Sequence, residues 1–398
     1  MELMLIFLLF ISNVQNSICM IVIPIESLNE DNYMIENDNS HVNTIKKYLF
    51  KDLYTLLEIG TPMQKIFLFI RINNQDFYLI SKTSFENKKE EDLFNYKYNL
   101  SNLYKVFDLF NEKNSISYIK QDCKETLGIS DDFELICNSN DSFLFFQEIN
   151  MTHKIIYDKF FFKLIIDTDS NIPGEIGLGL FDKYRNQENN FLKILKSNDL
   201  INNYNWYFDF DSYSSSKGKL IIGSLPHENY PDKFSENDLI FINIDINSYT
   251  LRNWRIEFDK IYFNDLDLSF KKVEFIFDSE IIIGTNELEL KLNEYFFNNL
   301  IFYKKCFSDI IKLPFYYYGL KFFYCNTNLQ RTLFEYFPSL NFFLNVLNYT
   351  FEITNEELFI IKEKYIYLKI LFPVSIKQNN FILGRIFTLK YPLVFNPD

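Results

Sequence analysis

EIGTPMQKIFLFIRINNQDFYLIS, residues 58–81, is the stretch that decides the fold. Residues 55–59 are apolar and favour a strand, and Gly60-Thr61-Pro62 is typical of a tight turn. Residues 66–72 form a nearly continuous apolar run of the kind that a buried strand shows. The polar residues 73–75 then interrupt the pattern. The stretch therefore predicts two strands joined by a tight turn, with a short polar loop where the second strand ends.

The length and composition bound the class of protein. A chain of 398 residues is too long for one ordinary core and long enough for two lobes. Its 45 phenylalanines and 27 tyrosines favour strands, so we expect a mostly β protein. The formal net charge of −13 argues against nucleic acid or an anionic membrane as a partner, because both need a basic face.

The first fifty residues carry the targeting signals. Residues 3–12 are apolar, long enough for the core of a signal peptide and too short to cross a bilayer, so we predict a signal peptide over residues 1–19. An uncleaved anchor is the alternative. Residues 20–50 predict a mobile leader or the remnant of a pro-segment, because the part from 26 to 43 shows no periodicity. We expect the product to be secreted or to lie in the endomembrane or vacuolar lumen.

Cysteines and glycosylation sequons support that route. If Cys19 leaves with the signal peptide, four cysteines remain in two local pairs, Cys123 with Cys137 and Cys306 with Cys325. These pairs suit two small-loop disulfides in an oxidising compartment, although four free thiols and two other connectivities stay open. Four sequons predict N-glycosylation, at Asn99, Asn140, Asn150 and Asn348.

The pattern I-G-T-P-x-Q at residues 59–64, followed by an apolar strand that ends in a short loop, resembles the first half of the pepsin-like aspartic peptidases, peptidase family A1. In that family the strand ends in Asp-Thr-Gly, and the Asp is one of two catalytic carboxylates. Here Arg71, Ile72 and Asn73 stand at those three positions. The frame is similar to that of the family, and the first catalytic residue is missing.

Further segments resemble the family in order along the chain. The segment 273–280, VEFIFDSE, is similar to the strand that carries the second carboxylate, with Asp278 present and Glu280 in place of a glycine. Tyr118 stands where the family has the tyrosine of its flap, a hairpin that closes over bound peptide; an ordinary strand tyrosine is the alternative. The other similar segments are PGEIGLGL at 173–180, KGKLIIGS at 217–224, WRIEFDKI at 254–261 and FILGRIF at 381–387.

The resemblance covers residues 54–395. It implies an all-β, bilobal pepsin-like aspartic protease fold with a few short helices, in which a pseudo-twofold axis relates two lobes with a cleft between them. The lobes are expected at residues 51–209 and 210–398. Pepsin-like zymogens mask their carboxylates with a basic pro-segment. Because only Lys46 and Lys47 are basic before residue 49, we expect no such masking device here.

Loss of the first carboxylate predicts loss of catalysis. In working members of the family, two adjacent carboxylates share a proton and hold the attacking water. An arginine has no accessible neutral form, so Arg71 cannot act as a base, and beside Asp278 it would hold that carboxylate ionised in a charge-assisted pair. Asn73 and Glu280 would also put side chains where the family loops need glycine.

The function that we expect is binding without hydrolysis. A peptide or protein ligand would lie in or around the interlobe cleft, or a partner would bind the outer surface. The alternative is a divergent endopeptidase active at acidic pH, in which Asp76 or Asp108 supplies the missing carboxylate. A storage or coat glycoprotein is a third reading. We expect a monomer without cofactor or metal, because the histidines show no ligand spacing: His41, His153 and His227.

Overall fold

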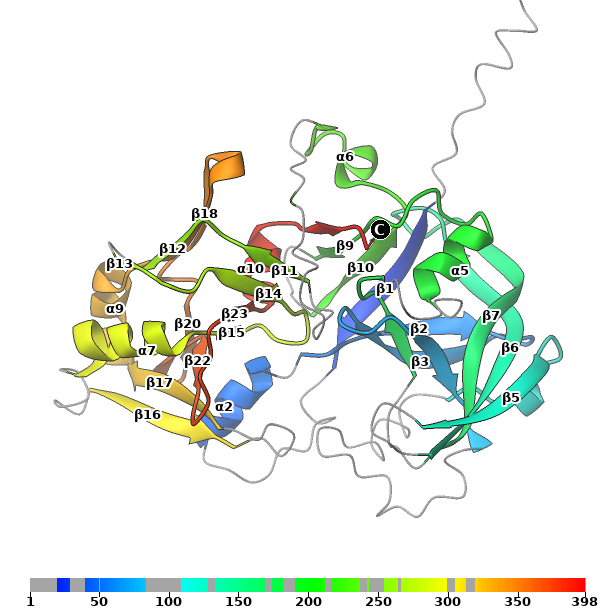
Figure 1. Ribbon diagram of the computed structural model, residues 1–398, viewed down its shortest axis with the longest axis horizontal. Helices are drawn as coiled ribbons and strands as arrows, with labels where there is room; N and C mark the ends of the chain where they lie inside the picture. Colours follow the sequence, from blue (N-terminus) through cyan, green and yellow to red (C-terminus); the bar gives the residue numbers. More distant parts are fainter. Residues whose placement is uncertain are drawn as a thin grey trace, which may run out of the picture.

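The computed structural model describes residues 20–28, 40–49, 51–83, 109–127, 133–168, 174–181, 190–211, 216–236, 242, 254–263, 266–298, 305–312 and 319–397. The predicted signal peptide, residues 1–19, lies outside these ranges. The described strands form two β-rich halves that lie side by side in Figure 1.

The first half is built on a sheet of eleven described strands. β6 also pairs with β1 and β2, so the sheet curls back on itself. The strand order is β24 (Val394–Phe395), β9 (Trp206–Phe210), β10 (Lys217–Ile222), β1 (Ile21–Ser27), β2 (Leu53–Ile59), β3 (Gln64–Arg71), β8 (Glu175–Gly177), β4 (Phe77–Ile80), β7 (Lys154–Thr168), β6 (Phe133–Phe146) and β5 (Ile119–Leu127).

The second half holds two sheets. The larger has the order β11 (Arg255–Glu257), β14 (Lys272–Phe275), β23 (Phe381–Leu383), β15 (Ile282–Ile283), β22 (Ile370–Pro373), β17 (Leu320–Asn326), β21 (Tyr365–Leu368) and β20 (Phe359–Lys362), with β16 (Cys306–Ile311) paired to β17. The smaller has the order β13 (Leu266–Asp267), β12 (Lys260–Phe263), β18 (Leu340–Leu344) and β19 (Tyr349–Ile353).

The described helices are short. The α-helices are α2 (Ser40–Leu49), α5 (Phe191–Ser197), α6 (Pro226–Asn229), α7 (Asn286–Leu292), α9 (Gln330–Tyr336) and α10 (Arg385–Lys390). Single turns of other helix types are η3 (Glu112–Asn114), η5 (Asn293–Phe297), η6 (Thr327–Leu329) and η7 (Asn345–Leu347).

The two halves repeat one pattern of strand pairing. In the first, β3 runs parallel to β8, β8 antiparallel to β4, and β4 parallel to β7. In the second, β14 runs parallel to β23, β23 antiparallel to β15, and β15 parallel to β22. β3 and β14 therefore hold equivalent places in the two halves. β3 ends at Arg71, and Asp278 follows the end of β14.

Two glycines allow two backbone segments to approach each other closely in these repeats. A Cβ on Gly177 would lie 2.6 Å from the carbonyl oxygen of Asp76, and a Cβ on Gly384 would lie 2.5 Å from that of Ile281. Neither contact is possible for a residue with a side chain, because backbone cannot move aside as a flexible side chain can. The glycines of these motifs are therefore required by the fold.

The predicted leader is part of the folded body. Ile21–Ser27 forms β1, which pairs along its length with β10 and also meets β2. Val42, Ile45 and Leu49 of α2 are buried in a cluster with residues from both lobes. The prediction of a mobile leader is therefore wrong for residues 20–28 and 40–49, because both stretches bury apolar side chains against distant strands.

The predicted lobe boundary at residue 209 falls inside a strand. β9 spans it, and β10, which follows the boundary, pairs with β1 and β9 in the first sheet. Both predicted disulfides are confirmed: Cys123 is bonded to Cys137 across β5 and β6, and Cys306 to Cys325 across β16 and β17.

Replacing Ile45 with alanine tests whether α2 belongs to the core. Ile45 is fully buried, so Ile45→Ala should lower the free energy of unfolding by about 2–5 kcal/mol. The matched control is Ile116→Ala, because Ile116 is 88% exposed and its loss should change stability by no more than about 0.5 kcal/mol. Urea unfolding followed by circular dichroism measures both; equal, small effects would mean that α2 does not contribute to the core.

Candidate functional site

Arg71 ends β3 and is surrounded by three acids. Its Nη1 forms a short ion pair with Oδ1 of Asp52 and lies 4.0 Å from Oδ2 of Asp278, while its Nε lies 3.4 Å from Oε1 of Glu175. The guanidinium also lies over the ring of Phe69, 4.7 Å from its centroid. The Arg71 side chain is 16% exposed, that of Asp52 is fully buried, and that of Asp278 is 40% exposed. The juxtaposition of Arg71 with Asp278 follows the arrangement expected from the sequence.

Three separate elements deliver these acids. Glu175 lies on β8, opposite Phe69 in the parallel pairing with β3, so it reaches the end of β3 directly. Asp278 follows β14, which holds the equivalent place in the other lobe. Asp52 comes immediately before β2, the neighbour of β3 on its other side. Asp52 could not be predicted as part of this site, because nothing in its local sequence distinguishes it from a solvated acid.

Tyr48 and Lys51 form backbone hydrogen bonds with the loop that carries Asp278. The N–H of Glu280 donates to the carbonyl of Tyr48 at 2.9 Å, and the N–H of Lys51 donates to the carbonyl of Asp278 at 2.8 Å. The Oγ of Ser279 lies 3.5 Å from the same Tyr48 carbonyl. The chain's own backbone therefore occupies the hydrogen-bonding groups of this loop.

A second buried arginine holds the same segment from the other side. Arg385 is fully buried at the start of α10; its Nη1 donates to Oγ of Ser27 at 2.7 Å, and its Nη2 donates to the carbonyl of Lys51 at 3.1 Å. The same Nη2 lies 3.8 Å from Oε1 of Glu280. Glu280, expected to crowd the loop in place of a glycine, instead forms an ion pair with Arg385.

Helix α2 packs between the lobes beside this site. Its buried side chains share one cluster with Tyr54, Phe67 and Phe69 of the first lobe and with residues of the second lobe: Ile281, Ile311, Leu320, Phe322, Ile360, Tyr367 and Leu371. Figure 1 shows α2 between the strands of the two halves. Helix α2 therefore lies between residues of both lobes, and the expectation that no basic masking segment exists stays a prediction.

The other predicted active-site residues differ in their contacts and exposure. Tyr118, half-buried, packs on Phe110, and its hydroxyl lies 3.1 Å from Oγ of Ser139; burial raises its pKa. These contacts suit a packed strand tyrosine, and a flap role stays a prediction. Asp76, considered as a substitute carboxylate, lies 3.7 Å from Nζ of Lys163. Asn73 is exposed and does not crowd its loop, and Asp108 lies outside the described residues.

The predicted sequons differ in accessibility. Asn150 and Asn348 are exposed in turns, so their modification stays a prediction. Asn140 is only 5% exposed within β6, between strands β5 and β7. This burial argues against a glycan on Asn140 in the folded chain, and its modification stays a prediction. Asn99 lies outside the described residues.

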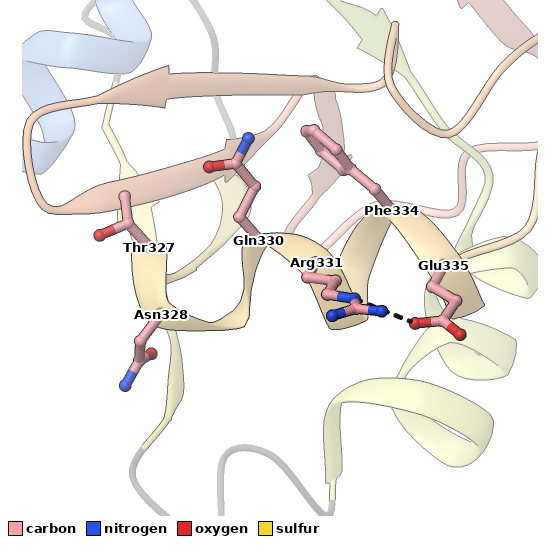
Figure 2. Close-up of a pocket in the computed structure, with 6 residues that line it drawn as sticks. All are labelled: Thr327, Asn328, Gln330, Arg331, Phe334 and Glu335. Carbon is pink, nitrogen blue, oxygen red and sulfur yellow. Dashed lines mark ion pairs between the residues drawn. The ribbon is translucent and has the colours of Figure 1, made fainter.

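A surface hollow lies away from the arginine site. It has a volume of about 630 Å³ and lies over η6 and α9, where Figure 2 shows its six lining residues: Thr327, Asn328, Gln330, Arg331, Phe334 and Glu335. Arg331 points towards Glu335, with 4.0 Å between Nε and Oε2, and its side chain is 94% exposed. None of the predicted site residues lines this hollow. Within the described ranges, no group of three histidines, cysteines or acids is arranged to hold a metal ion.

Two solved structures share this architecture. The crystal structure of basic 7S globulin from soybean matches with a TM-score of 0.58 at 12% sequence identity, covering 95% of this chain and 92% of that chain. The crystal structure of conglutin gamma, a basic 7S globulin from lupine seeds, matches with a TM-score of 0.60 at 12% identity and the same coverage. No protein-family model matches the sequence, and no curated protein is similar to it.

At this identity the likeness concerns the fold alone. The predicted fold class is confirmed as an all-β bilobal fold with a few short helices. In the part of the chain that the structure describes, no helix has both the length and the apolar character needed to cross a membrane.

Removing the guanidinium of Arg71 tests its role in stability. In Arg71→Met, the buried Asp52 loses its ion pair with the guanidinium, which should cost about 3–5 kcal/mol of unfolding free energy. The double variant Arg71→Met with Asp52→Asn should cost clearly less than the sum of the two single changes, because both charges of the pair are then removed together. Urea unfolding measures all three.

The matched control is Arg331→Met, which removes an exposed ion pair and should change stability by about 0–1 kcal/mol. Additive effects of the Arg71 and Asp52 substitutions would show that the ion pair contributes nothing to stability.

Proposed function

We propose that this chain is a pepsin-like protein without peptidase activity that binds a peptide or protein ligand. The observation that supports the loss of activity is the guanidinium of Arg71, in contact with both Asp52 and Asp278. The aspartic mechanism needs two neighbouring carboxylates that share one proton and hold a water between them. Arginine has no accessible neutral form, so it can neither share a proton with a neighbouring carboxylate nor act as the base that activates the water.

The chain's own segment indicates the chemistry of the ligand. Tyr48 and Lys51 offer the loop of Asp278 one backbone acceptor and one backbone donor, as an added strand does, and Asp52 presents its carboxylate to Arg71. A ligand that exchanged with this segment would meet the same three groups. We therefore propose an extended peptide that carries an aspartate or glutamate, because arginine and carboxylate form strong charge-assisted hydrogen bonds.

We propose that the protein works outside the cytoplasm, secreted or in the lumen of an endomembrane or vacuolar compartment. The two disulfides support this location, since disulfides form and persist in oxidising compartments. The monomeric state and the absence of nucleic-acid and membrane partners stay predictions.

A peptidase assay tests the loss of activity. The purified full chain should release no product from a fluorogenic peptide library between about pH 3 and pH 7, the range over which carboxylate pairs serve as acid and base. Pepsin in the same assay is the positive control. Turnover that is sensitive to pepstatin and disappears in Asp278→Asn would establish an aspartic endopeptidase and end the proposal.

A peptide-binding experiment tests the ligand class. Selection from a random peptide library should enrich extended peptides that contain Asp or Glu. In Asp52→Asn, the side chain that competes with the peptide for Arg71 loses its charge. A larger fraction of the protein is then competent to bind, so the affinity for these peptides should rise about tenfold or more.

A rise in affinity distinguishes release of Arg71 for the ligand from general destabilisation, because a merely destabilised protein binds more weakly. Glu335→Gln, which changes an exposed acid at the surface hollow, is the matched control and should leave the affinity unchanged. No enrichment from the library, or an affinity that Asp52→Asn does not change, would exclude the region around Arg71 as the binding site.

A further inference from the structure

The two disulfides differ in their exposure to solvent. Cys123 is exposed, while its partner Cys137 is fully buried. In the other disulfide both cysteines are buried, since Cys306 is 0% exposed and Cys325 is 1% exposed. A thiolate breaks a disulfide by reaching one of its sulfurs, so exposure decides which bond can react in the folded chain. Of the two disulfides, the one at Cys123 therefore offers a thiolate a point of attack.

Cys123 lies on a strand that contributes little to the core. β5 is the last strand in the order of the first sheet, where it pairs with β6. Figure 1 shows β5 at the outer edge of the first half. Each side chain from Ile119 to Lys124 is exposed, so this stretch buries little apolar surface. It is therefore held mainly by its backbone pairing with β6 and by the disulfide.

A β-bulge divides the pairing of β5 with β6. Lys120 lies opposite Ser139, and Cys123 lies opposite Cys137, so two residues of β5 face one residue of β6 between these pairs. The disulfide joins the first pair after the bulge, and the pairing then continues to the end of β5. Because a bulge interrupts the ladder, the outer part of β5, residues 123–127, gains little support from the pairs before it.

The buried disulfide is enclosed by strands. Cys325 lies on β17, which pairs with β16 through Cys306 and with β21 on its other side, where Ile366 is opposite Cys325. A thiolate could reach these sulfurs only after the strands around them had opened, which costs the free energy of a local unfolding event. We therefore expect this bond to resist reduction in the folded chain.

We propose that the Cys123–Cys137 disulfide is a thiol-exchange site for a dithiol, and that its reduction releases the outer part of β5 from β6. A thiolate of the dithiol attacks Sγ of Cys123 and forms a bond to it, while the bond to Cys137 breaks and Cys137 leaves as a thiolate. The second thiol then attacks the sulfur of the dithiol in this mixed disulfide, and Cys123 leaves as a thiolate. The two protons of the dithiol end on the two cysteines. The protein disulfide is thus reduced by two electrons, and the dithiol is oxidised to a disulfide.

Release of the outer part of β5 changes the edge of the first sheet. It uncovers the backbone groups with which residues 133–137 of β6 had paired. Unpaired backbone groups at a sheet edge can pair with another strand. The exchange at Cys123 requires no peptide ligand and is independent of the proposed binding function.

Reduction of the folded chain followed by alkylation tests the selectivity. The full chain is treated with dithiothreitol, trapped with iodoacetamide and mapped by mass spectrometry. Cys123 and Cys137 should be alkylated at least about tenfold faster than Cys306 and Cys325, because the buried pair reacts only after local unfolding. Glutathione, a monothiol, should form its mixed disulfide on Cys123. Equal rates for the two pairs, or a glutathione adduct on Cys137, would overturn the proposal.

Amide hydrogen exchange tests the release of β5. After reduction of the folded chain, the amides of residues 123–127 should lose protection several-fold, whereas those of β16 should not change because its disulfide stays closed. The double variant Cys123→Ser with Cys137→Ser lacks the bond and should show the same loss without a reductant. Dithiothreitol should cause no further change in this variant, which makes it the matched control. Unchanged protection of residues 123–127 after reduction, or a further loss in the treated double variant, would exclude the release.

Discussion

The ion pair between Arg71 and Asp52 is the interaction on which the site depends. Asp52 is fully buried, and a buried carboxylate without a partner costs several kcal/mol, so the acid and the guanidinium require each other. This requirement holds the segment before β2 against the end of β3. The same segment bonds through Lys51 to the loop of Asp278 and continues from α2, so one ion pair brings three parts of the molecule together.

The backbone and the side chains of this site follow different requirements. The repeated crossing of strands needs glycine at Gly177 and Gly384, because carbonyl oxygens lie where a Cβ would be. The fold does not need carboxylates at the ends of β3 and β14. Arginine can therefore replace one of them, provided that acids nearby balance its charge, and Asp52, Glu175 and Asp278 do so. The bilobal β architecture thus accommodates an arginine at the end of β3.

Much of the fold and half of the site could be predicted from the sequence. The two-lobed β architecture, the disulfides and the meeting of Arg71 with Asp278 all follow from local patterns placed in a known frame. The places of β1 and α2 could not be predicted, because β1 pairs with β10 nearly two hundred residues away, and α2 packs on strands near both ends of the chain. The contacts of His41 with Tyr324, Tyr365 and Tyr367 could not be predicted either, because these residues lie far from it in the chain.

The sequence by itself determined the strand and turn pattern, the placing of four cysteines in two local pairs, and the presence of an arginine where a strand meets a loop. These features depend on what each residue does to its own backbone and to its near neighbours in the chain. Only the tertiary structure decided which acids surround Arg71 and what lies between the lobes. Those partners are set by long-range strand register, as when Glu175 faces Phe69, and by the burial of an amphipathic helix against two distant surfaces. Neither the strand register nor this burial can be predicted from residues that are close together in the sequence.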